Sequence, residues 1–412
     1  MTSKEKKQNY LALIIVIAIF IALLFFGNYI FAKNQPGGTD FLYRWLPTRL
    51  VLFEDYQNPY SSAIEYQVEL MHHGHAHGED ETPGIFAYPY YTMAVFLPFA
   101  LIKDFLLARA AWMTLMELAH VGIILLTLRM VKVIPAKSII LALTLFALFS
   151  AEFTQALIDG NPSSLAAFFA VLSLFFISRK SDTWAGVFLT LATIKPQLAI
   201  LFFALVWIWA FFRQRWGIIY SSLATLLLLL GVSFLLQPSW FAEFINDLTT
   251  YTNVASPSTP RAILAYWMPA PFANSIAWGL TILSTFTLLG IWIHSFKKDF
   301  SGFLWAYSFT FAIMPLTGIT SAKSNYIAML PAVILLLQYG SKKFKNSEFW
   351  LSSFLWIWIG LSWYFFTLGR SWVIGERLIY FVDFYPLPIL LLSLYYLVRP
   401  FKINRKPINE KV

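Results

Sequence analysis

Residues 10–31 read YLALIIVIAIFIALLFFGNYIF, an apolar run without a charged side chain. About 20 apolar residues are enough for an α-helix to cross the hydrocarbon core of a bilayer. Comparable runs recur to the end of the chain, which is 58% hydrophobic and 12% charged. Since a soluble domain contains about 25% charged residues, the composition excludes a water-soluble protein and predicts an all-α membrane protein.

The start of the chain is basic, with Lys4, Lys6 and Lys7 ahead of this run. The run is longer than the apolar part of a secretory signal, and no small-residue cleavage site follows it. We therefore interpret it as an uncleaved anchor. The absence of cysteine excludes disulfides and thiolate metal sites. The net charge of +9 is better explained by basic cytoplasmic loops than by nucleic-acid binding.

Twelve membrane spans are predicted. Residues 184–212 lie between two basic loops and must cross twice, with Lys195-Pro196 at the turn, because proline disfavours a continuous helix. Residues 85–102 contain two prolines and are interpreted as re-entrant or interfacial. This choice keeps most Lys and Arg residues, and both termini, in the cytoplasm of a multi-pass cell-membrane protein. The other ten spans are expected near residues 10–31, 106–128, 138–157, 163–178, 217–236, 273–294, 301–318, 325–340, 349–366 and 378–398.

Residues 1–412 are expected to form a single domain with two long outer loops. The loops cover residues 32–105 and 237–272 and are longer than a simple connection requires, which favours a functional role. The first loop predicts an amphipathic helix on the membrane surface. Its apolar residues at helical spacing are Phe41, Trp45, Leu46 and Leu50.

Asp40 is the first acidic residue after the first span and follows a Pro-Gly-Gly turn. A carboxylate at the boundary of bilayer and water can act as a general base on a hydroxyl group. Aspartate is also a favoured N-cap, so Asp40 can start the next helix, and the two roles are compatible. Glu54 and Asp55 are two adjacent acidic residues, an arrangement that is more typical of a solvated face than of catalysis.

Four histidines are concentrated in the first long loop, and three acidic residues follow them. Imidazole and carboxylate groups bind zinc or copper. A catalytic metal site, however, usually draws its ligands from separate rigid elements, whereas this tract is interspersed with glycine. We interpret it as a surface segment with incidental metal affinity and predict no cofactor. The histidines are His72, His73, His75 and His77.

Charged side chains within the apolar segments are costly to bury, so each is a functional hypothesis. Lys195 is the most informative, because it lies at a helix break and needs an anionic partner. Glu152 and a lipid phosphate are equally good candidates for that partner. Glu152 and Asp159 are seven residues apart and so lie on one helical face. Glu117 and Asp383 are the other acids of this kind.

Four cations are expected on the same outer side as Asp40. Together they can converge on an anionic headgroup, because arginine matches phosphate geometry. Taken singly, each is also explained by snorkelling at a helix end. No nucleotide-binding motif is present, so energy or activated substrate must arrive through the membrane or along a gradient. The four cations are Arg261, Lys323, Arg370 and Arg377.

Three stretches of the sequence resemble glycosyltransferase family 87, the DUF2029 group of the GT-C superfamily. Residues 39–61 read TDFLYRWLPTRLVLFEDYQNPYS, with an Asp-Phe pair, an aromatic helix and an Asn-Pro-Tyr ending. Residues 88–102 read YPYYTMAVFLPFALI and resemble the family's Tyr-Pro segment. Residues 154–216 contain an asparagine before a span, then Ala-Gly, Lys-Pro and a basic pair. The likeness covers roughly residues 10–216, and the C-terminal half matches in layout.

The resemblance implies a GT-C-like fold and transfer of a sugar, often mannose, from a polyprenyl-phosphate donor. The acceptor would be lipid- or glycan-linked, on the extracytoplasmic face, with inversion at the anomeric carbon. By resemblance, Asp40 is the general base, Asn161 and Lys195 belong to the site, and Lys195 neutralises the donor phosphate. Tyr88 would hold the sugar or the prenyl chain.

Two positions depart from the family pattern. The Gly-Gln that precedes the family's asparagine reads Asp159-Gly160 here, and Lys323 or Asn325 stands where a histidine is expected. A transporter or lipid flippase is the main alternative, and a non-catalytic scaffold is a third. An acid at the membrane exit favours the enzyme, since a transporter concentrates polar groups near the midplane. The expected partners are donor, acceptor and membrane lipids, without nucleic acid.

Overall fold

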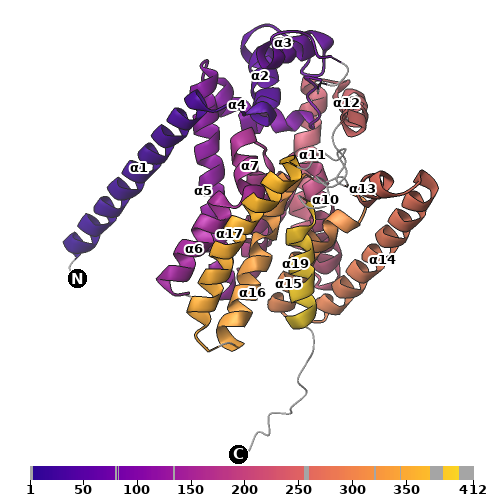
Figure 1. Cartoon of the computed structure of the whole chain (residues 1–412). Coiled ribbons are helices and arrows are strands. Elements are labelled where there is room, and N and C mark those ends of the chain that lie inside the picture. Colours follow the sequence, from indigo (N-terminus) through magenta and orange to yellow (C-terminus); the bar gives the residue numbers. More distant parts are fainter. Residues whose placement is uncertain are drawn as a thin grey trace, which may run out of the picture.

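The computed structural model describes residues 3–78, 81, 83–132, 135–254, 259–319, 322–343, 345–371 and 384–398. Within these ranges every regular element is a helix and no strand is present. Figure 1 shows a bundle of helices from which the N-terminal helix α1 leans away. The expected all-α fold is confirmed.

The helices of the first half are separated mostly by short turns. A bend of 52° separates α6 from α7. In chain order the elements are α1 (Ser3–Asn34), α2 (Thr39–Phe53), α3 (Ser62–His73), η1 (Tyr90–Thr92), α4 (Met93–Ala100), α5 (Phe105–Val131), α6 (Lys137–Phe149), α7 (Ala151–Asp159), α8 (Ser163–Ser178), α9 (Asp182–Leu191), η2 (Ala192–Ile194) and α10 (Pro196–Phe212).

The second half continues in the same way. Its elements are α11 (Trp216–Leu236), α12 (Trp240–Val254), α13 (Pro260–Trp267), α14 (Ala270–Phe296), α15 (Phe300–Ile313), η3 (Met314–Leu316), η4 (Lys323–Met329), α16 (Leu330–Lys343), α17 (Ser347–Ser371) and α19 (Pro386–Val398).

Five helices among the described residues are long and apolar enough to cross a membrane, or six if the bent pair α6 and α7 is one span. They are α1, α5, α11, α14 and α17. The other apolar helices are shorter. The 16 residues of α8, for example, rise about 24 Å, which is less than the roughly 30 Å hydrocarbon core. Of the twelve expected spans, only these five or six are supported.

The two difficult segments of the sequence have clear structures. Residues 184–212 are broken at Lys195, whose backbone leaves the helical region, and Pro196 opens α10. This is the break that the Lys-Pro pair predicts. Residues 85–102 contain the short 3-10 helix η1 and the eight-residue helix α4. At about 12 Å it is too short to span, in agreement with the re-entrant or interfacial interpretation.

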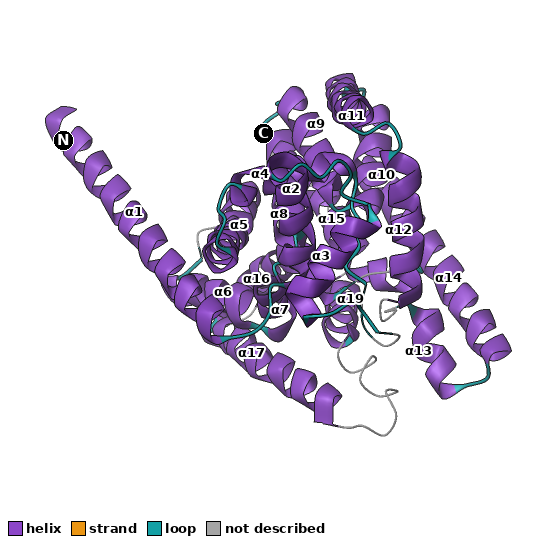
Figure 2. Ribbon diagram, turned by 90° about the horizontal axis from the view of Figure 1, so that it is seen from above, coloured by secondary structure: helices purple, strands orange, loops and turns teal. Residues whose placement is uncertain are grey.

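The helices of the two long loops gather largely at one end of the bundle. Figure 1 shows α2, α3, α4 and α12 at this end. Figure 2 looks down on it and shows α2 and α3 over the centre of the molecule. The expected helix over the first loop is present as α2. Its polar residues Arg44, Thr48 and Arg49 are buried together with its aromatic face.

Aromatic packing holds α2 against α5. The ring of Phe41 stacks on Trp112 of α5 at 5.5 Å, and Phe96 of α4 contacts the same indole at 4.7 Å. A hydrogen bond also fixes the orientation of α2, since Trp45 Nε1 donates to the carbonyl of Phe99 at 2.9 Å. The start of α2 is therefore fixed relative to the bundle, which matters because it carries Asp40.

Candidate active site

The chain enters α2 through a glycine turn that only glycine can form. Gly37 and Gly38 have φ of +123° and +83°. A Cβ on either residue would lie within 2.8 Å of the Arg109 side chain. Arg109 is buried in α5 and donates to the carbonyls of Gln35 at 3.0 Å and Pro36 at 3.2 Å. The guanidinium thereby sets where the chain leaves α1 and where α2 begins.

A second turn, between α7 and α8, is fastened to the same two elements. Gly160 has a φ of +72°, and a Cβ there would lie 2.5 Å from Cβ of Phe41. Trp112 Nε1 donates to the Gly160 carbonyl at 2.8 Å, and Arg109 donates to the Ile158 carbonyl at 3.2 Å. These contacts bring Asn161 to the start of α2, although more than a hundred residues separate the two in sequence.

Asp40 is the second residue of α2 and is held on both carboxylate oxygens. Arg44, one turn later, donates to Oδ1 at 2.9 Å and to the backbone carbonyl of Asp40 at 2.6 Å. Asn161 Nδ2 donates to Oδ2 at 2.7 Å. The N-cap is Gly38, without a side-chain cap. The N-cap role expected for Asp40 is therefore wrong, because its side chain is directed to Arg44 and Asn161 instead.

Lys195 is buried to 1% exposure and fixes the orientation of Asn161. Its Nζ donates to Asn161 Oδ1 at 2.5 Å, to Ser324 Oγ at 3.3 Å and to Ser163 Oγ. An ammonium can only donate and a carboxylate can only accept. The amide must therefore present its oxygen to Lys195 and its nitrogen to Asp40. The anionic group nearest in this chain of bonds is Asp40 and not Glu152.

The resulting arrangement is a continuous polar cluster, which we call the Asp40 network. Ser163 Oγ lies 2.9 Å from Asn325 Oδ1 and so connects η4 to α8. All of its members are buried except Asp40, whose side chain is 28% exposed. The carboxylate is the point at which this buried cluster meets the surroundings. The members are Asp40, Arg44, Asn161, Ser163, Lys195, Ser324 and Asn325.

Tyr88 adjoins the Asp40 network through Arg44. The guanidinium of Arg44 lies 4.3 Å from the centre of the Tyr88 ring, a cation–π distance. The backbone carbonyl of Tyr88 accepts a hydrogen bond from Tyr60 at 2.7 Å. Tyr88 itself is buried. The side chain of Arg44 therefore contacts both Tyr88 and Asp40.

The other acidic residues singled out in the sequence are not members of the Asp40 network. Asp55 is exposed at the far end of α2, with a φ of +61°. Glu152 is buried in the first turn of α7, whereas Asp159 is exposed at its end and interacts electrostatically with Arg109. Glu117 accepts a hydrogen bond from Asn28 of α1 at 2.7 Å. Asp383 lies outside the described residues.

Two of the four expected outer cations have side chains among the described residues. Arg261 is exposed on α13 and lines a cavity of about 350 Å³ with residues of α14, such as Thr281. Lys323 lies 5.1 Å from the ring centre of Phe366, another cation–π contact. Arg377 and the side chain of Arg370 lie outside the described residues.

The four histidines of the tract contact three different sets of residues. His72 lies 3.2 Å from Thr39 Oγ1 and 3.0 Å from the Tyr43 hydroxyl, so α3 contacts α2 next to Asp40. His73 and His75 lie 3.7 and 3.8 Å from Glu81. His77 instead bonds Glu69 of α3 at 2.5 Å.

Carboxylates on α3 and α12 are crowded together beyond this tract. Burial, and then repulsion from Glu65 and Glu243, raises the pKa of Asp247 to about 7. Burial, with repulsion from Glu69, also raises the pKa of Glu65. The crowding identifies an acidic region separate from the Asp40 network.

Several residues of the Asp40 network were not expected from the sequence. Arg44 had a signal that was available, because an acid and a base four residues apart on a helix form an ion pair. Ser163 and Ser324 had none, since serine is common at helix starts and in turns. Arg109, which holds both turns, was also missed.

Comparison with known proteins gives one finding. The family model of glycosyltransferase family 87 matches residues 86–317, more than half of the chain. The match includes Tyr88, Asn161, Lys195 and Arg261, and it begins beyond Asp40. No curated protein and no solved structure matches the chain significantly.

Proposed function

The chain belongs to glycosyltransferase family 87 and is a membrane glycosyltransferase, and we propose that it uses a polyprenyl-phosphate sugar with Asp40 as the general base. The observation that carries this proposal is the exposure of Asp40 at the edge of an otherwise buried polar network. Mannose is the first candidate sugar, and a lipid- or glycan-linked hydroxyl is the acceptor.

The hydrogen bonds of Asp40 suit a general base. A carboxylate offers about four acceptor sites, and Arg44 and Asn161 take one on each oxygen. An acceptor hydroxyl can use a remaining site and give its proton to Asp40. The hydroxyl oxygen then bonds to the anomeric carbon while the bond from that carbon to the phosphate oxygen breaks. The lipid phosphate leaves with the electron pair, and the anomeric configuration inverts.

The charge of the network favours an anionic donor. It contains one carboxylate and two cations, Arg44 and Lys195, in a buried setting where charge interacts strongly. Because Lys195 is only 1% exposed, we propose that it acts as a positioning residue through Asn161. Its positive charge would also stabilise the donor phosphate from a distance. We assign direct contact with the phosphate to the more accessible Lys323 first and Arg261 second. Arg370 is a further candidate.

The proposed topology follows from the charge distribution. Both termini would lie in the cytoplasm, and the end of the bundle that carries α2, α3 and α12 would face outward. A lipid-linked donor then reaches Asp40 from the membrane without a nucleotide site. This arrangement needs the short helices to cross in pairs, as the twelve-span prediction has it.

Sugar transfer in reconstituted membranes tests the proposal. Protein in liposomes would receive polyprenyl-phosphate mannose and a lipid-extract acceptor pool. We expect Asp40→Asn to lower transfer by about 10²–10⁴-fold, because the amide cannot take the proton. Asp55→Asn is the matched control, since it makes the same change in an exposed acid just beyond the opposite end of the same helix. Asparagine also tolerates the positive φ at that position.

The alternatives give different results. A transporter or flippase would move the lipid donor across the liposome membrane without forming product, and Asp40→Asn would leave that movement unchanged. Absence of transfer with mannose, glucose and arabinose donors by folded protein would contradict the proposal. Equal transfer by Asp40→Asn and Asp55→Asn would exclude Asp40 as the base.

A further inference from the structure

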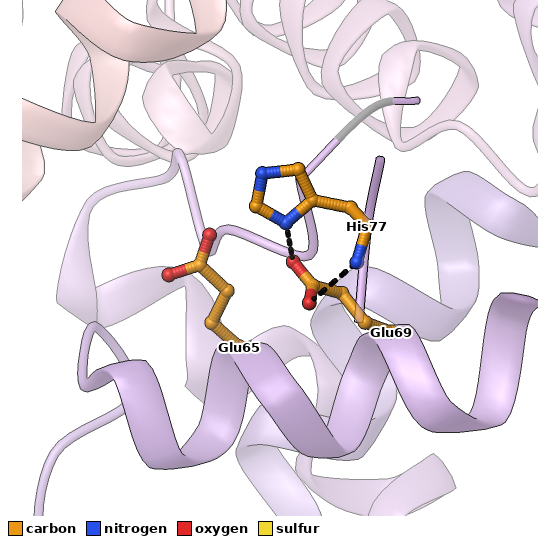
Figure 3. Close-up of side chains that lie close together, drawn as sticks. All are labelled: Glu65, Glu69 and His77. Atoms are coloured by element: carbon orange, nitrogen blue, oxygen red, sulfur yellow. Dashed lines mark hydrogen bonds and ion pairs between the residues drawn. The ribbon is translucent and has the colours of Figure 1, made fainter. Parts of the chain in front are cut away.

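Three potential metal ligands come together where the loop after α3 returns to that helix. Glu65 and Glu69 are one turn apart on α3, and His77 lies opposite them on the loop (Figure 3). One ligand atom from each lies within 4.8 Å of the other two. The figure shows both carboxylates and the imidazole on the same side of the helix.

Glu69 is a rigid centre for this group. Its carboxylate accepts from His77 Nδ1 at 2.5 Å, from the His77 backbone at 3.1 Å and from the Gly84 backbone at 3.1 Å. The side chain is only 4% exposed. His77 and Gly84 of the loop are therefore already bonded to Glu69, with the His77 ring directed at the helix. A site with prearranged ligands loses little entropy on binding an ion.

Two further carboxylates are incompletely bonded among the described residues. The carboxylate of Glu65 forms no hydrogen bond or ion pair among the described residues, although the Glu69 carboxylate is adjacent. Asp247 of α12 is only 7% exposed, and its Oδ2 has no hydrogen-bond partner in the described ranges. Asp247 interacts electrostatically with Glu65. Buried carboxylates without partners are costly unless a cation compensates them.

We propose that Glu65, Glu69 and His77 bind a divalent cation of the zinc type, with Asp247 as a neighbouring carboxylate. The ion joins α3 to the loop at residues 74–84 and neutralises the charge facing α12. Two carboxylates and one imidazole leave a fourth position for water in the tetrahedral geometry that zinc prefers. An imidazole ligand favours zinc over magnesium or calcium, which take oxygen ligands.

The proposed site is distinct from the Asp40 network but connected to it. The loop that the ion would hold continues to Tyr88, whose ring packs on Arg44 at 4.3 Å. The opposite end of α3 carries His72, which contacts Thr39 next to Asp40. An ion at Glu65 and Glu69 therefore stabilises both flanks of the base without touching the reacting atoms.

Metal titration of the purified full-length protein tests the site. Protein in detergent would be stripped with chelator, dialysed and titrated with Zn²⁺ by calorimetry. We expect one equivalent to bind to the wild type, and the affinity to fall by at least about tenfold in Glu65→Gln and in His77→Ala. Glu65 is the better probe, because its carboxylate supports no hydrogen bond among the described residues and its loss leaves the loop folded.

His75→Ala is the matched control, since it removes an exposed histidine of the same tract. We expect it to bind Zn²⁺ as the wild type does. Zn²⁺ should also slow hydrogen exchange at residues 74–84 in the wild type and in His75→Ala but not in Glu65→Gln.

The contrary results are equally clear. An affinity that falls in His75→Ala and stays unchanged in Glu65→Gln would assign the metal to the exposed tract and overturn the site. Absence of stoichiometric binding by folded protein, or tighter binding of Mg²⁺ than of Zn²⁺, would overturn it as well.

Discussion

Two polar clusters lie near each other at one end of the molecule, and their charges are opposite. The Asp40 network contains one carboxylate and two cations, and amide and hydroxyl groups fill the space between them. The cluster around Glu65 contains carboxylates and a single imidazole. One is suited to an anion beside a base, and the other to a cation.

The carboxylates of the two clusters differ in how completely they are bonded, since both oxygens of Asp40 accept hydrogen bonds. In the Asp40 network, Lys195 uses all three ammonium donors and Asn161 uses both ends of its amide. Around Glu65, the carboxylate of Asp247 retains an oxygen without a partner among the described residues. Hydrogen bonds on both oxygens fix the position of the Asp40 carboxylate, whereas a buried carboxylate oxygen without a partner is a position at which a ligand can bind.

Removing Lys195 is the strongest way to separate positioning from charge within the Asp40 network. We expect Lys195→Met to lower kcat by about 10²-fold, since Asn161 loses the donor that orients its amide and Asp40 shifts from its productive position. The donor KM should change little, because Lys195 is buried. Steady-state kinetics with varied donor concentration measure both constants.

Lys323→Met provides the contrast to Lys195→Met. Lys323 is partly exposed at the start of η4, so we expect its loss to raise the donor KM with a smaller change in kcat. If Lys195→Met instead raised KM and left kcat intact, Lys195 would contact the donor directly. The positioning role would then be wrong.

The sequence predicts much of the fold because apolar runs and prolines act locally. The break at Lys195-Pro196 and the short helix over 85–102 follow from proline geometry. The number of spans is harder to predict, because hydropathy alone does not tell a spanning helix from a short one packed inside the bundle. The burial of Arg49 in α2 was missed for a similar reason, since the carbonyl of Ala100 that it bonds comes from a distant segment.

The sequence alone singles out Asp40 and Lys195, but their assembly with Asn161 into one site was predictable only through the family resemblance. Asp40, Asn161 and Lys195 are far apart in sequence, and no periodicity connects them, yet hydrogen bonds join all three. The histidine tract shows the opposite case. Its composition indicates metal affinity, but only folding reveals that His77 meets Glu69 while His73 and His75 face Glu81.

Gly160→Ala tests whether backbone geometry holds Asn161 against Asp40. An alanine at this positive φ costs about 1–2 kcal/mol, and its Cβ would meet Phe41 at 2.5 Å. We expect a lower Tm in detergent and an approximately tenfold lower transfer rate, because the turn must move away from α2.

Gly279→Ala is the control for this change. Gly279 lies in α14 with open space around the Cβ position, so alanine should keep or slightly raise the Tm through its better helix propensity. A Gly160→Ala protein as stable and active as Gly279→Ala would mean that the turn does not set the Asp40 geometry.

Removing the metal should have the smallest effect on transfer. We expect chelator to slow the wild type only a few-fold and Zn²⁺ to restore it, because the ion orders the loop before Tyr88 and does not touch Asp40. Glu65→Gln should start at the slower rate and respond to neither treatment. If chelator instead abolished transfer as completely as Asp40→Asn does, the ion would take part in the reaction itself. The two clusters would then form one catalytic centre, and their opposite charges would have to act on the same substrate.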